Sequence, residues 1–321
     1  MDSSEIQLRT GGADDWAAIA DMVGQAFHQP HDQAMRDIEG AVFEPERALV
    51  ADDAGVVVGH AAAYTRELTV PGAVIPAAHV TQVGVAPTHR RRGLLTRMMR
   101  RQLGEIAAAG REAVAVLWAS EGKIYPRFGY GLASQHLHLD VMTREIRLTD
   151  PAPAPPGEAT RLRLVQPGEA VADLAKVYEQ LRPERPGWSS RDDRWWQYVL
   201  ADAESLRRGA TALHGVVHDT PGGPTGYALW RGVPHWDRHG PDGEVRIREV
   251  AATYATLWRF LLSIDLTRNA TAEFRPLDEP LQHLVDEPRR LGTRISDGLW
   301  IRLVDLPRAL AARRYATDVD V

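Results

Sequence analysis

The chain has 321 residues, of which 44% are apolar and 25% charged, a composition typical of a globular protein with room for two domains. Its formal charge of −5 argues against nucleic-acid binding, so the local arginine cluster at residues 90–92 is either a site or a solvated face. The absence of cysteine excludes disulfides and thiolate chemistry, and no charged and apolar leader follows Met1. We therefore expect a cytoplasmic protein without a nucleic-acid or membrane partner.

The first third of the chain predicts alternating strands and helices. Residues 6–9 are expected to form a strand, and Asp14 or Asp15 to cap a helix that carries apolar side chains from Trp16 onward. Residues 48–51 and 56–64 read as two strands of a hairpin, because turn residues separate them.

Residues 79–101 predict a strand, a turn and a helix. Val83 and Val85 belong to a buried strand with an irregularity at Gly84, and Pro87 ends its pairing. A helix is expected to begin near Arg90, because apolar residues then recur at helical spacing. Such a helix start leaves backbone N–H groups free beside arginines, where a pyrophosphate would fit.

The elements after this helix complete the first predicted domain. Residues 113–118 form a short apolar strand, residues 120–127 a short helix or loop, and residues 136–141 a final alternating strand. The fold class is therefore α/β, with a mixed sheet of the α+β kind.

Two motifs carry a resemblance to a known family. The sequences VGVAP at residues 83–87 and RRRGLL at residues 90–95 resemble the acetyl-CoA signature of the GNAT N-acetyltransferases. More narrowly, ASEGKIYPRFGYG at residues 119–131 resembles the Eis (enhanced intracellular survival) family of that superfamily. Leu95 stands where the general signature has Gly or Ala, a departure that the Eis-like branch shares. The resemblance implies acetyl-CoA as co-substrate, its phosphates held by Arg90, Arg91 and the N–H groups of Gly93, Leu94 and Leu95.

The resemblance also implies the domain organisation. Residues 1–148 would be the catalytic GNAT domain, the Pro-rich residues 149–160 a linker, and residues 161–303 a second, degenerate GNAT-like domain without a cofactor motif. Residues 304–321 resemble the start of a sterol-carrier-like third domain, with Val319-Asp320-Val321 opening its first strand. We therefore expect a truncated or naturally shortened member, and a homo-oligomer, with a hexamer as the assembly that the resemblance suggests.

Acetyl transfer needs an acid for the departing thiolate and a donor for the thioester carbonyl. The resemblance assigns the general acid to Tyr125; a core tyrosine is the alternative, and Tyr130 more simply serves the turn. The backbone N–H of Val83 is the expected carbonyl donor, and Val83 and Val85 would pair with the pantetheine arm as an added strand. Ser120 either bonds the cofactor or caps the next helix.

The general base is not assigned, because the resemblance gives that role to the C-terminal carboxylate of the third domain. Glu121 is close in sequence but reads as a solvated loop residue. Trp16, Gln82 and Trp118 are candidates for the acceptor pocket, although each tryptophan fits a core position equally well. No metal site is expected, because histidine pairs such as His136 and His138 are more often structural.

The expected function is acetyl-CoA-dependent N-acetylation of polycationic small molecules such as aminoglycosides, a reaction associated with antibiotic resistance. Two alternatives remain open from the sequence. One is a non-catalytic protein that binds cationic ligands or regulates a partner, and the other is an acetyltransferase for protein lysines.

Overall fold

The computed structural model describes residues 6–29, 31–149 and 160–315. They form two compact units that do not follow chain order: the first takes its residues from Met1–Ala133, Pro183–Ala201 and Leu299–Val321, and the second from Ser134–Arg182 and Asp202–Gly298. The predicted ranges 1–148 and 161–303 were contiguous, so the structure divides the chain differently. Most of the predicted linker, residues 150–159, lies outside the described residues.

The first unit is built on a mixed sheet in the strand order β1-β2-β3-β4-β5-β16-β6. Neighbouring strands are antiparallel except for β4 and β5, which are parallel. The strands are β1 (Gln7–Thr10), β2 (Ala48–Asp53), β3 (Val56–Val70), β4 (Ala73–Val85), β5 (Val114–Trp118), β6 (Gly131–Leu132) and β16 (Leu299–Leu303).

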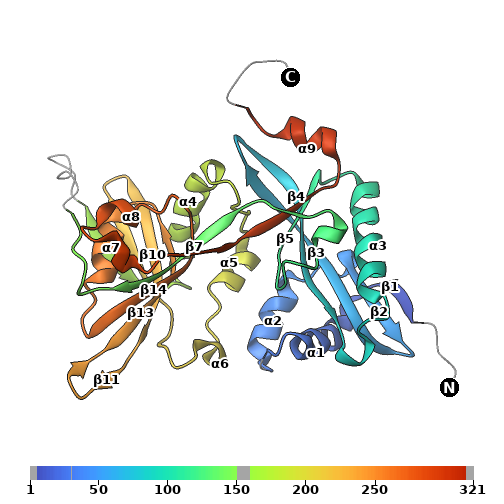
Figure 1. Cartoon of the computed structure of the whole chain (residues 1–321), viewed down its shortest axis with the longest axis horizontal. Helices are drawn as coiled ribbons and strands as arrows, with labels where there is room; N and C mark the ends of the chain where they lie inside the picture. The colour runs from blue at the N-terminus through green and yellow to red at the C-terminus, as the bar shows by residue number, and fades with distance from the viewer. Residues whose placement is uncertain (1–5, 30, 150–159, 316–321) are drawn as a thin grey trace. The chain divides into compact units, whose positions relative to one another are not determined.

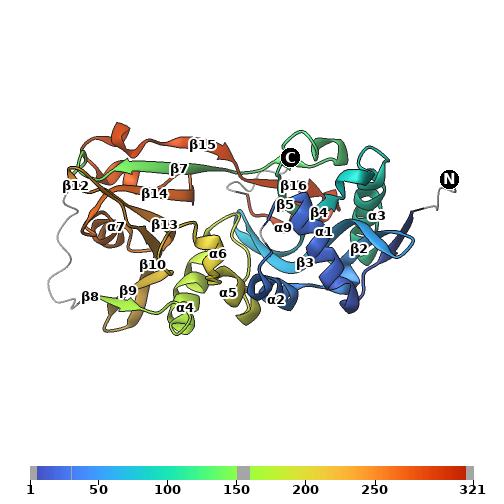
Figure 2. The same ribbon diagram turned by 90° about the horizontal axis from the view of Figure 1, so that it is seen from below.

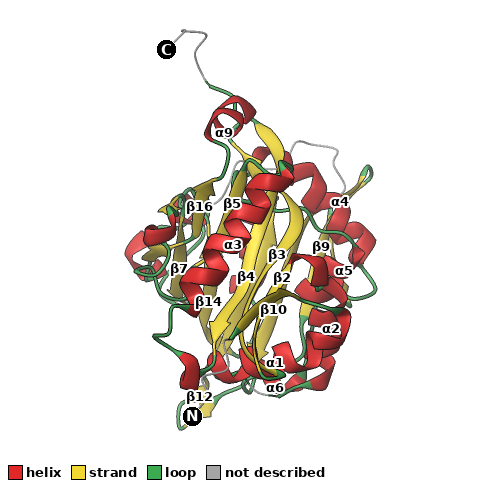
Figure 3. Cartoon of the chain, turned by 90° about the vertical axis from the view of Figure 1, so that its right-hand side faces the viewer, coloured by secondary structure: helices red, strands yellow, loops and turns green. Residues whose placement is uncertain are grey.

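Helices cover both faces of this sheet. Val50 packs with α1 and its neighbour Ala51 packs with α3, and successive residues of a strand point to opposite faces. Figure 3 looks onto the face that α3 crosses. The helices of the unit are α1 (Trp16–Ala26), α2 (Gln33–Val42), α3 (Leu94–Ala109), α5 (Asp193–Val199) and α9 (Leu306–Ala312), with short 3-10 turns η1 (Ala13–Asp15), η2 (Pro45–Arg47), η3 (Pro87–His89) and η4 (Pro126–Phe128).

The structure differs from the sequence predictions in the cap of α1, the start of α3 and the presence of α2. The side chain of Asp15 does not cap α1; it binds Arg9 at 2.6 Å and accepts a hydrogen bond from the Gly12 N–H. Helix α3 begins at Leu94 rather than near Arg90, and the sequence reading missed α2 altogether.

The second unit repeats the sheet pattern in the order β15-β7-β14-β13-β10-β9-β8, with β13 and β14 parallel. Its strands are β7 (Gln135–Met142), β8 (Arg161–Val165), β9 (His214–Thr220), β10 (Gly223–Val233), β13 (Gly243–Ala251), β14 (Thr267–Arg275) and β15 (Arg294–Asp297), and a separate ribbon joins β11 (Trp236–Asp237) to β12 (Gly240–Pro241). Its helices are α4 (Val171–Leu181), α6 (Glu204–Arg207), α7 (Tyr254–Leu262) and α8 (Leu281–Leu284), with 3-10 turn η6 (Pro288–Leu291); turn η5 (Arg182–Glu184) lies where the chain passes into the first unit.

The two sheets exchange one strand each. Strand β7 was predicted to end the first domain, but it pairs with β14 and β15 in the second sheet. Strand β16, from the far end of the chain, pairs with β5 in the first sheet. Figure 1 traces this exchange by chain colour, and Figure 2 shows β7 between β14 and β15 and β16 beside β5. In the first sheet β16 lies beside the parallel strands β4 and β5, and in the second sheet β7 lies beside the parallel strands β13 and β14. Each of these two strands comes from a part of the sequence that is distant from most of its sheet.

The chain after β16 also stays with the first unit. Ala309 of α9 packs into the same apolar cluster as Leu68, Val116 and Leu299. Residues 304–315, which the sequence suggested as the start of a third domain, therefore belong to the first unit, while Val319-Asp320-Val321 lies outside the described residues. No helix in the described ranges is long and apolar enough to cross a membrane.

Candidate active site

The site begins where the parallel strands β4 and β5 separate. Their pairing runs only from Ala77 to His79 on β4, although β4 continues to Val85 and β5 to Trp118. Beyond His79, the edge of β4 that faces away from β3 therefore has no partner strand in the described structure. An unpaired strand edge offers backbone groups to an extended ligand.

A bulge lies in the same part of β4. The register with β3 shifts between His60 and Ala62, and Gln82 has a φ of 51°, a left-handed conformation that is unusual for this residue type. His60 Nδ1–H donates to the Gln82 carbonyl at 3.0 Å and so holds the bulge from β3. The irregularity predicted at Gly84 therefore exists, but its unusual torsion is at Gln82.

The start of α3 has free donors. The first helical hydrogen bond runs from Arg97 N–H to the Gly93 carbonyl, and no side chain caps the preceding N–H groups. Gly93 adopts a φ of 78°, and a Cβ at this position would meet no atom within 4 Å. Arg90, Arg91 and Arg92 are exposed and form no hydrogen bond or ion pair with any described residue. This arrangement fits the phosphates of acetyl-CoA, because it offers free N–H groups and cations without bulk.

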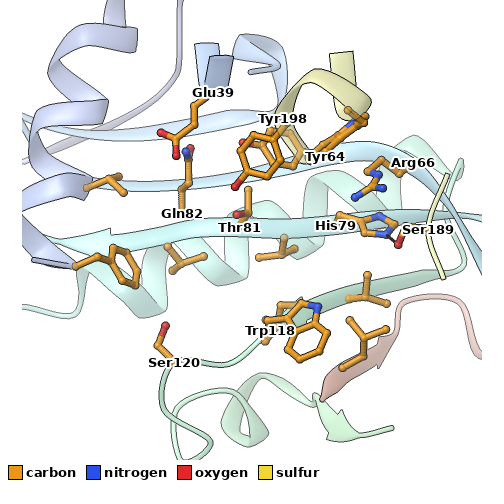
Figure 4. Close-up of a pocket in the computed structure, with 18 of the residues that line it drawn as sticks. Glu39, Tyr64, Arg66, His79, Thr81, Gln82, Trp118, Ser120, Ser189 and Tyr198 are labelled. Atoms are coloured by element: carbon orange, nitrogen blue, oxygen red, sulfur yellow. Dashed lines mark hydrogen bonds between the residues drawn. The ribbon is translucent and has the colours of Figure 1, made fainter. Parts of the chain in front are cut away.

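A cavity of about 350 Å³, here called the β4 cavity, opens beside the separated strands. All of its lining residues belong to the first unit. They come from α1 and the residues after it (Val23, Phe27, Gln29), α2 (Glu39), β3 (Tyr64, Arg66), β4 (His79, Val80, Thr81, Gln82, Val83), β5 (Val116, Leu117, Trp118), the loop after β5 (Ser120, Tyr125), the segment around α5 (Gly187, Ser189, Trp195, Tyr198) and Leu299. Figure 4 shows how the labelled members surround the opening.

Tyr125 lines the β4 cavity and is 8% exposed. Its ring meets that of Tyr130 edge-on, with centroids 5.9 Å apart. Burial raises the pKa of Tyr125, so its hydroxyl stays protonated and able to donate. The hydroxyl of Tyr130 is buried without a hydrogen-bond partner in the described structure, and Tyr130 does not line the cavity.

His79 and Ser189 form a hydrogen-bonded pair in the cavity wall. The Ala77 carbonyl can only accept, so His79 Nδ1 carries the hydrogen of that 3.0 Å contact, and Nε2 accepts from the Ser189 hydroxyl at 2.8 Å. Burial and the nearby Arg66 cation lower the pKa of His79 to about 3. A histidine this weakly basic stays neutral and cannot activate Ser189 as a nucleophile.

The segment that carries Ser189, residues 187–190, is hydrogen-bonded to β3 beyond Ala62, where β3 no longer pairs with β2. Thr69 N–H donates to the Trp188 carbonyl, Gly187 N–H donates to the Thr69 carbonyl, and Arg66 donates to the Ser190 carbonyl. The Arg66 guanidinium also lies 4.0 Å above the Trp195 ring. Residues far along the chain thus supply one wall of the cavity.

The structure gathers some of the predicted site residues and separates others. Tyr125, Val83, Ser120, Gln82 and Trp118 all line the β4 cavity. The predicted phosphate ligands lie outside it, at the turn that follows β4: Arg90, Arg91, Gly93, Leu94 and Leu95. The side chain of Val85 packs in the core with Leu94 and Met98, as does part of Val83.

Trp16 does not line the β4 cavity. Its ring packs against Phe43 with centroids 5.0 Å apart, and its Nε1–H donates to the Arg36 carbonyl at 3.0 Å. This is the core position that the sequence left open as the alternative. Trp118, in contrast, is 53% exposed at the end of β5.

Sequence reasoning missed the cavity residues outside the two motifs. Glu39 lies on α2, which the sequence did not predict, and Tyr64, Arg66 and His79 lie in or beside strands that were predicted from their apolar pattern alone. Trp195 lies within residues 161–303, which were predicted to form the second domain, but the structure places it in the first unit. No group of three or more His, Cys, Asp or Glu residues that could hold a metal ion is present in the described structure.

Comparisons with known proteins agree with this geometry. A family model described as an acetyltransferase (GNAT) domain matches residues 7–133, and a second model of the same description matches residues 187–303. An uncharacterized N-acetyltransferase of Streptomyces avermitilis is 42% identical over 96% of this chain and 76% of its own. N-acetyltransferase Eis of Mycobacterium tuberculosis is 38% identical over 84% of this chain and 67% of its own. The crystal structure of Eis1 from Mycobacterium abscessus matches 98% of this chain and 78% of its own, with 33% identity and a TM-score of 0.78.

The chain belongs to the Eis-like family of GNAT N-acetyltransferases. As an Eis-like enzyme it is an acyltransferase that acts on amines, and GNAT acetyltransferases take the acetyl group from acetyl-CoA. The matches extend over both units, so the Eis-like fold includes the tandem GNAT arrangement.

Proposed function

We propose that the chain transfers the acetyl group of acetyl-CoA to an amine of a polycationic small molecule of the aminoglycoside class. The observation that carries this proposal is the convergence of three features on β4. Its free edge begins after His79, its bulge lies at Gln82, and the uncapped start of α3 follows its end. Tyr125 lines the cavity that opens at the same edge.

In this proposal the donor lies along the free edge of β4. Arg90, Arg91 and the N–H groups of Gly93 to Leu95 hold its phosphates, and the backbone of Val83 and Val85 pairs with its pantetheine arm. Acetyl-CoA supplies an activated acyl group as a thioester. Ser120, which is exposed just after β5 and lines the cavity, would bond the donor through its hydroxyl.

Two groups of the chain would act on the reacting atoms. The Val83 N–H donates to the thioester oxygen as negative charge develops there. As the amine forms the new C–N bond and the C–S bond breaks, the Tyr125 hydroxyl, kept protonated by its raised pKa, gives its proton to the departing sulfur; the amine loses its proton to water, and Tyr125 regains one from water. Gln82, beside Val83, faces the acceptor. Glu121 is exposed and does not line the cavity, so we assign it no role as a base.

The lining of the β4 cavity supports a cationic acceptor. The faces of Tyr64, Trp118 and Tyr198 can hold ammonium groups, and Glu39 adds a carboxyl group. A volume of about 350 Å³ is at the small end of ligand pockets, enough for one sugar ring with its substituents. These features favour a small molecule over a protein lysine on an extended peptide.

We further propose that the second unit has no donor site and supports a homo-oligomer. Helix α7 follows β13 as α3 follows β4, yet it begins after Ala252 and Thr253, where no arginine and glycine turn is present. Without such a turn the phosphates would lack their ligands.

The donor site is tested with Arg91→Ala. Loss of one charged phosphate contact should weaken acetyl-CoA binding about 10-fold, measured by calorimetry. Arg100→Ala is the matched control, because Arg100 is also exposed and has no partner among the described residues but lies farther along α3. Equal affinities in the two variants would contradict the assignment of Arg91.

The acceptor class is tested by thiol release from acetyl-CoA with kanamycin and with a lysine-containing peptide. We expect turnover with kanamycin and a much lower kcat/KM with the peptide. The reverse preference would favour protein acetylation, and acetyl-CoA binding without turnover on either would favour a binding protein.

A further inference from the structure

Glu39 places a carboxyl group without a described partner at the β4 cavity. It lies on α2 and lines the β4 cavity, and Figure 4 shows its side chain directed toward Gln82. Neither a hydrogen bond nor an ion pair joins it to any residue that the structure describes. Arg36, one helical turn earlier, is instead bound to Asp21 at 2.6 Å. Glu39 therefore keeps its acceptor atoms available to a ligand.

Gln82 offers a second acceptor in the same place. Its side-chain oxygen is buried and has no hydrogen-bond partner within the described structure. A buried acceptor without a donor costs about 1 to 3 kcal/mol, and a turn of the Gln82 amide would bring this oxygen into the cavity, where a ligand donor would remove that cost. A carboxylate and an amide oxygen together match an ammonium group, which has three donors and no acceptor.

The cavity contains little positive charge to neutralise Glu39. Among the described lining residues, Arg66 alone carries a permanent positive charge. Arg66 donates to the Ser190 carbonyl and lies over the Trp195 ring, so its charge is directed toward residues 190–195. Tyr64 and Tyr198 add aromatic faces near the opening, which also favour a cation.

We propose that Glu39 binds an ammonium group of the acceptor other than the amine that is acetylated. This inference rests on the proposed function. An attacking amine must be neutral, whereas a carboxylate partner keeps an amine protonated, so one amine cannot serve both purposes well. Glu39 is then a specificity-determining residue: it selects acceptors with at least two amino groups over those with one.

The pKa of Glu39 is consistent with this role. Burial raises it, and the Arg36 cation opposes that shift. A bound ammonium would replace the lost solvation and lower the pKa of the carboxyl group again.

The test crosses two acceptors with two variants. One acceptor is a cyclohexane ring with amino groups on opposite carbons, and the other has a hydroxyl in place of one amino group. The wild-type chain should prefer the diamine in kcat/KM by about 10- to 100-fold, the range expected for a charged hydrogen bond. Glu39→Gln should remove this preference, mainly through a higher KM for the diamine.

Asp37→Asn is the matched control, because it removes the same charge from the same helix. Asp37 is exposed, accepts a hydrogen bond from Gln33 and does not line the cavity. This variant should keep the wild-type preference. A preference that survives in Glu39→Gln would overturn the proposal, and so would an equal fall of kcat for both acceptors, which would make Glu39 a proton acceptor.

Equilibrium binding tests the role of Glu39 even if neither acceptor is acetylated. In calorimetry, the diamine should bind the wild-type chain about 10-fold or more tightly than the amino alcohol, and the two should bind Glu39→Gln alike. Equal affinities for the wild-type chain would overturn the role of Glu39. Acetyl-CoA affinity, measured in the same samples, shows separately whether the donor site of the proposed function is intact.

Discussion

Tyr125 and Tyr130 show how position within one short loop separates two residues of the same type. Both are buried and their rings touch, yet only Tyr125 lines the β4 cavity. Tyr130 is 3% exposed and its hydroxyl has no partner in the described part of the chain. A buried hydroxyl without a partner adds little stability, so Tyr130 contributes through its ring.

The pair allows a controlled test of the general acid. Tyr125→Phe should lower kcat by about 100-fold or more while acetyl-CoA affinity stays the same, because only proton donation is lost. Tyr130→Phe should leave kcat unchanged and the free energy of unfolding equal or slightly higher. Steady-state kinetics and chemical denaturation measure both. Similar kcat values for the two variants would exclude Tyr125 as the acid.

At the scale of an element, the bulge of β4 depends on a buried histidine of β3. His60 is fully buried and donates through Nδ1 to the Gln82 carbonyl, while its Nε2 has no partner among the described residues. Burial lowers the pKa of His60 to about 4, so the folded chain holds it neutral. Protonation would leave the Nδ1–H bond to Gln82 in place but would bury a positive charge, so its cost is one of lost solvation.

This histidine should make the fold sensitive to acid. The unfolded chain binds the proton near pH 6.5 and the folded chain only near pH 4, so stability falls as the pH decreases through this interval. The loss attributable to His60 is about 3 kcal/mol. His60→Asn keeps a donor for the Gln82 carbonyl and should unfold with a shallower pH dependence in urea titrations. An unchanged dependence would show that His60 is not responsible.

At the scale of the whole molecule, each sheet is completed by a strand from the other part of the sequence. Strand β16 pairs with β5 through Leu299 to Leu303, and β7 pairs with β14. The first unit therefore needs residues near the end of the described chain, and the second needs residues that follow the first GNAT motif. The two sequence domains cannot be separated at the linker without breaking both sheets.

Hydrogen exchange can locate the effect of a single exchanged residue. Leu299 is 6% exposed and packs with Val116, so Leu299→Ala should destabilise the first unit by about 2 to 3 kcal/mol. Exchange should accelerate in β5 and stay slow in β14, although Leu299 follows the second unit in sequence. Ile295→Ala, at a site that is 57% exposed in β15, is the control and should have little effect. Faster exchange confined to β14 would contradict the pairing.

The sequence by itself determined the local parts of this protein. Alternating and helical apolar patterns predicted β4, α3 and β5, and the motifs at residues 83–95 and 119–131 identified the family and nominated Tyr125 and residues 90–95 as site residues. Such features depend on residues close together in the chain, which is why a pattern can reveal them.

Tertiary structure decided what depends on distant pairing. Strand β7 looks the same in sequence whichever sheet it joins, because alternation records a buried face and not a partner. Glu39, His79 and Ser189 meet in one cavity only because α2, β4 and the segment before α5 all pack against or pair with β3. The residues proposed to hold the donor lie close together in the chain and could be predicted from a motif, whereas the walls of the β4 cavity come from many stretches between Val23 and Leu299.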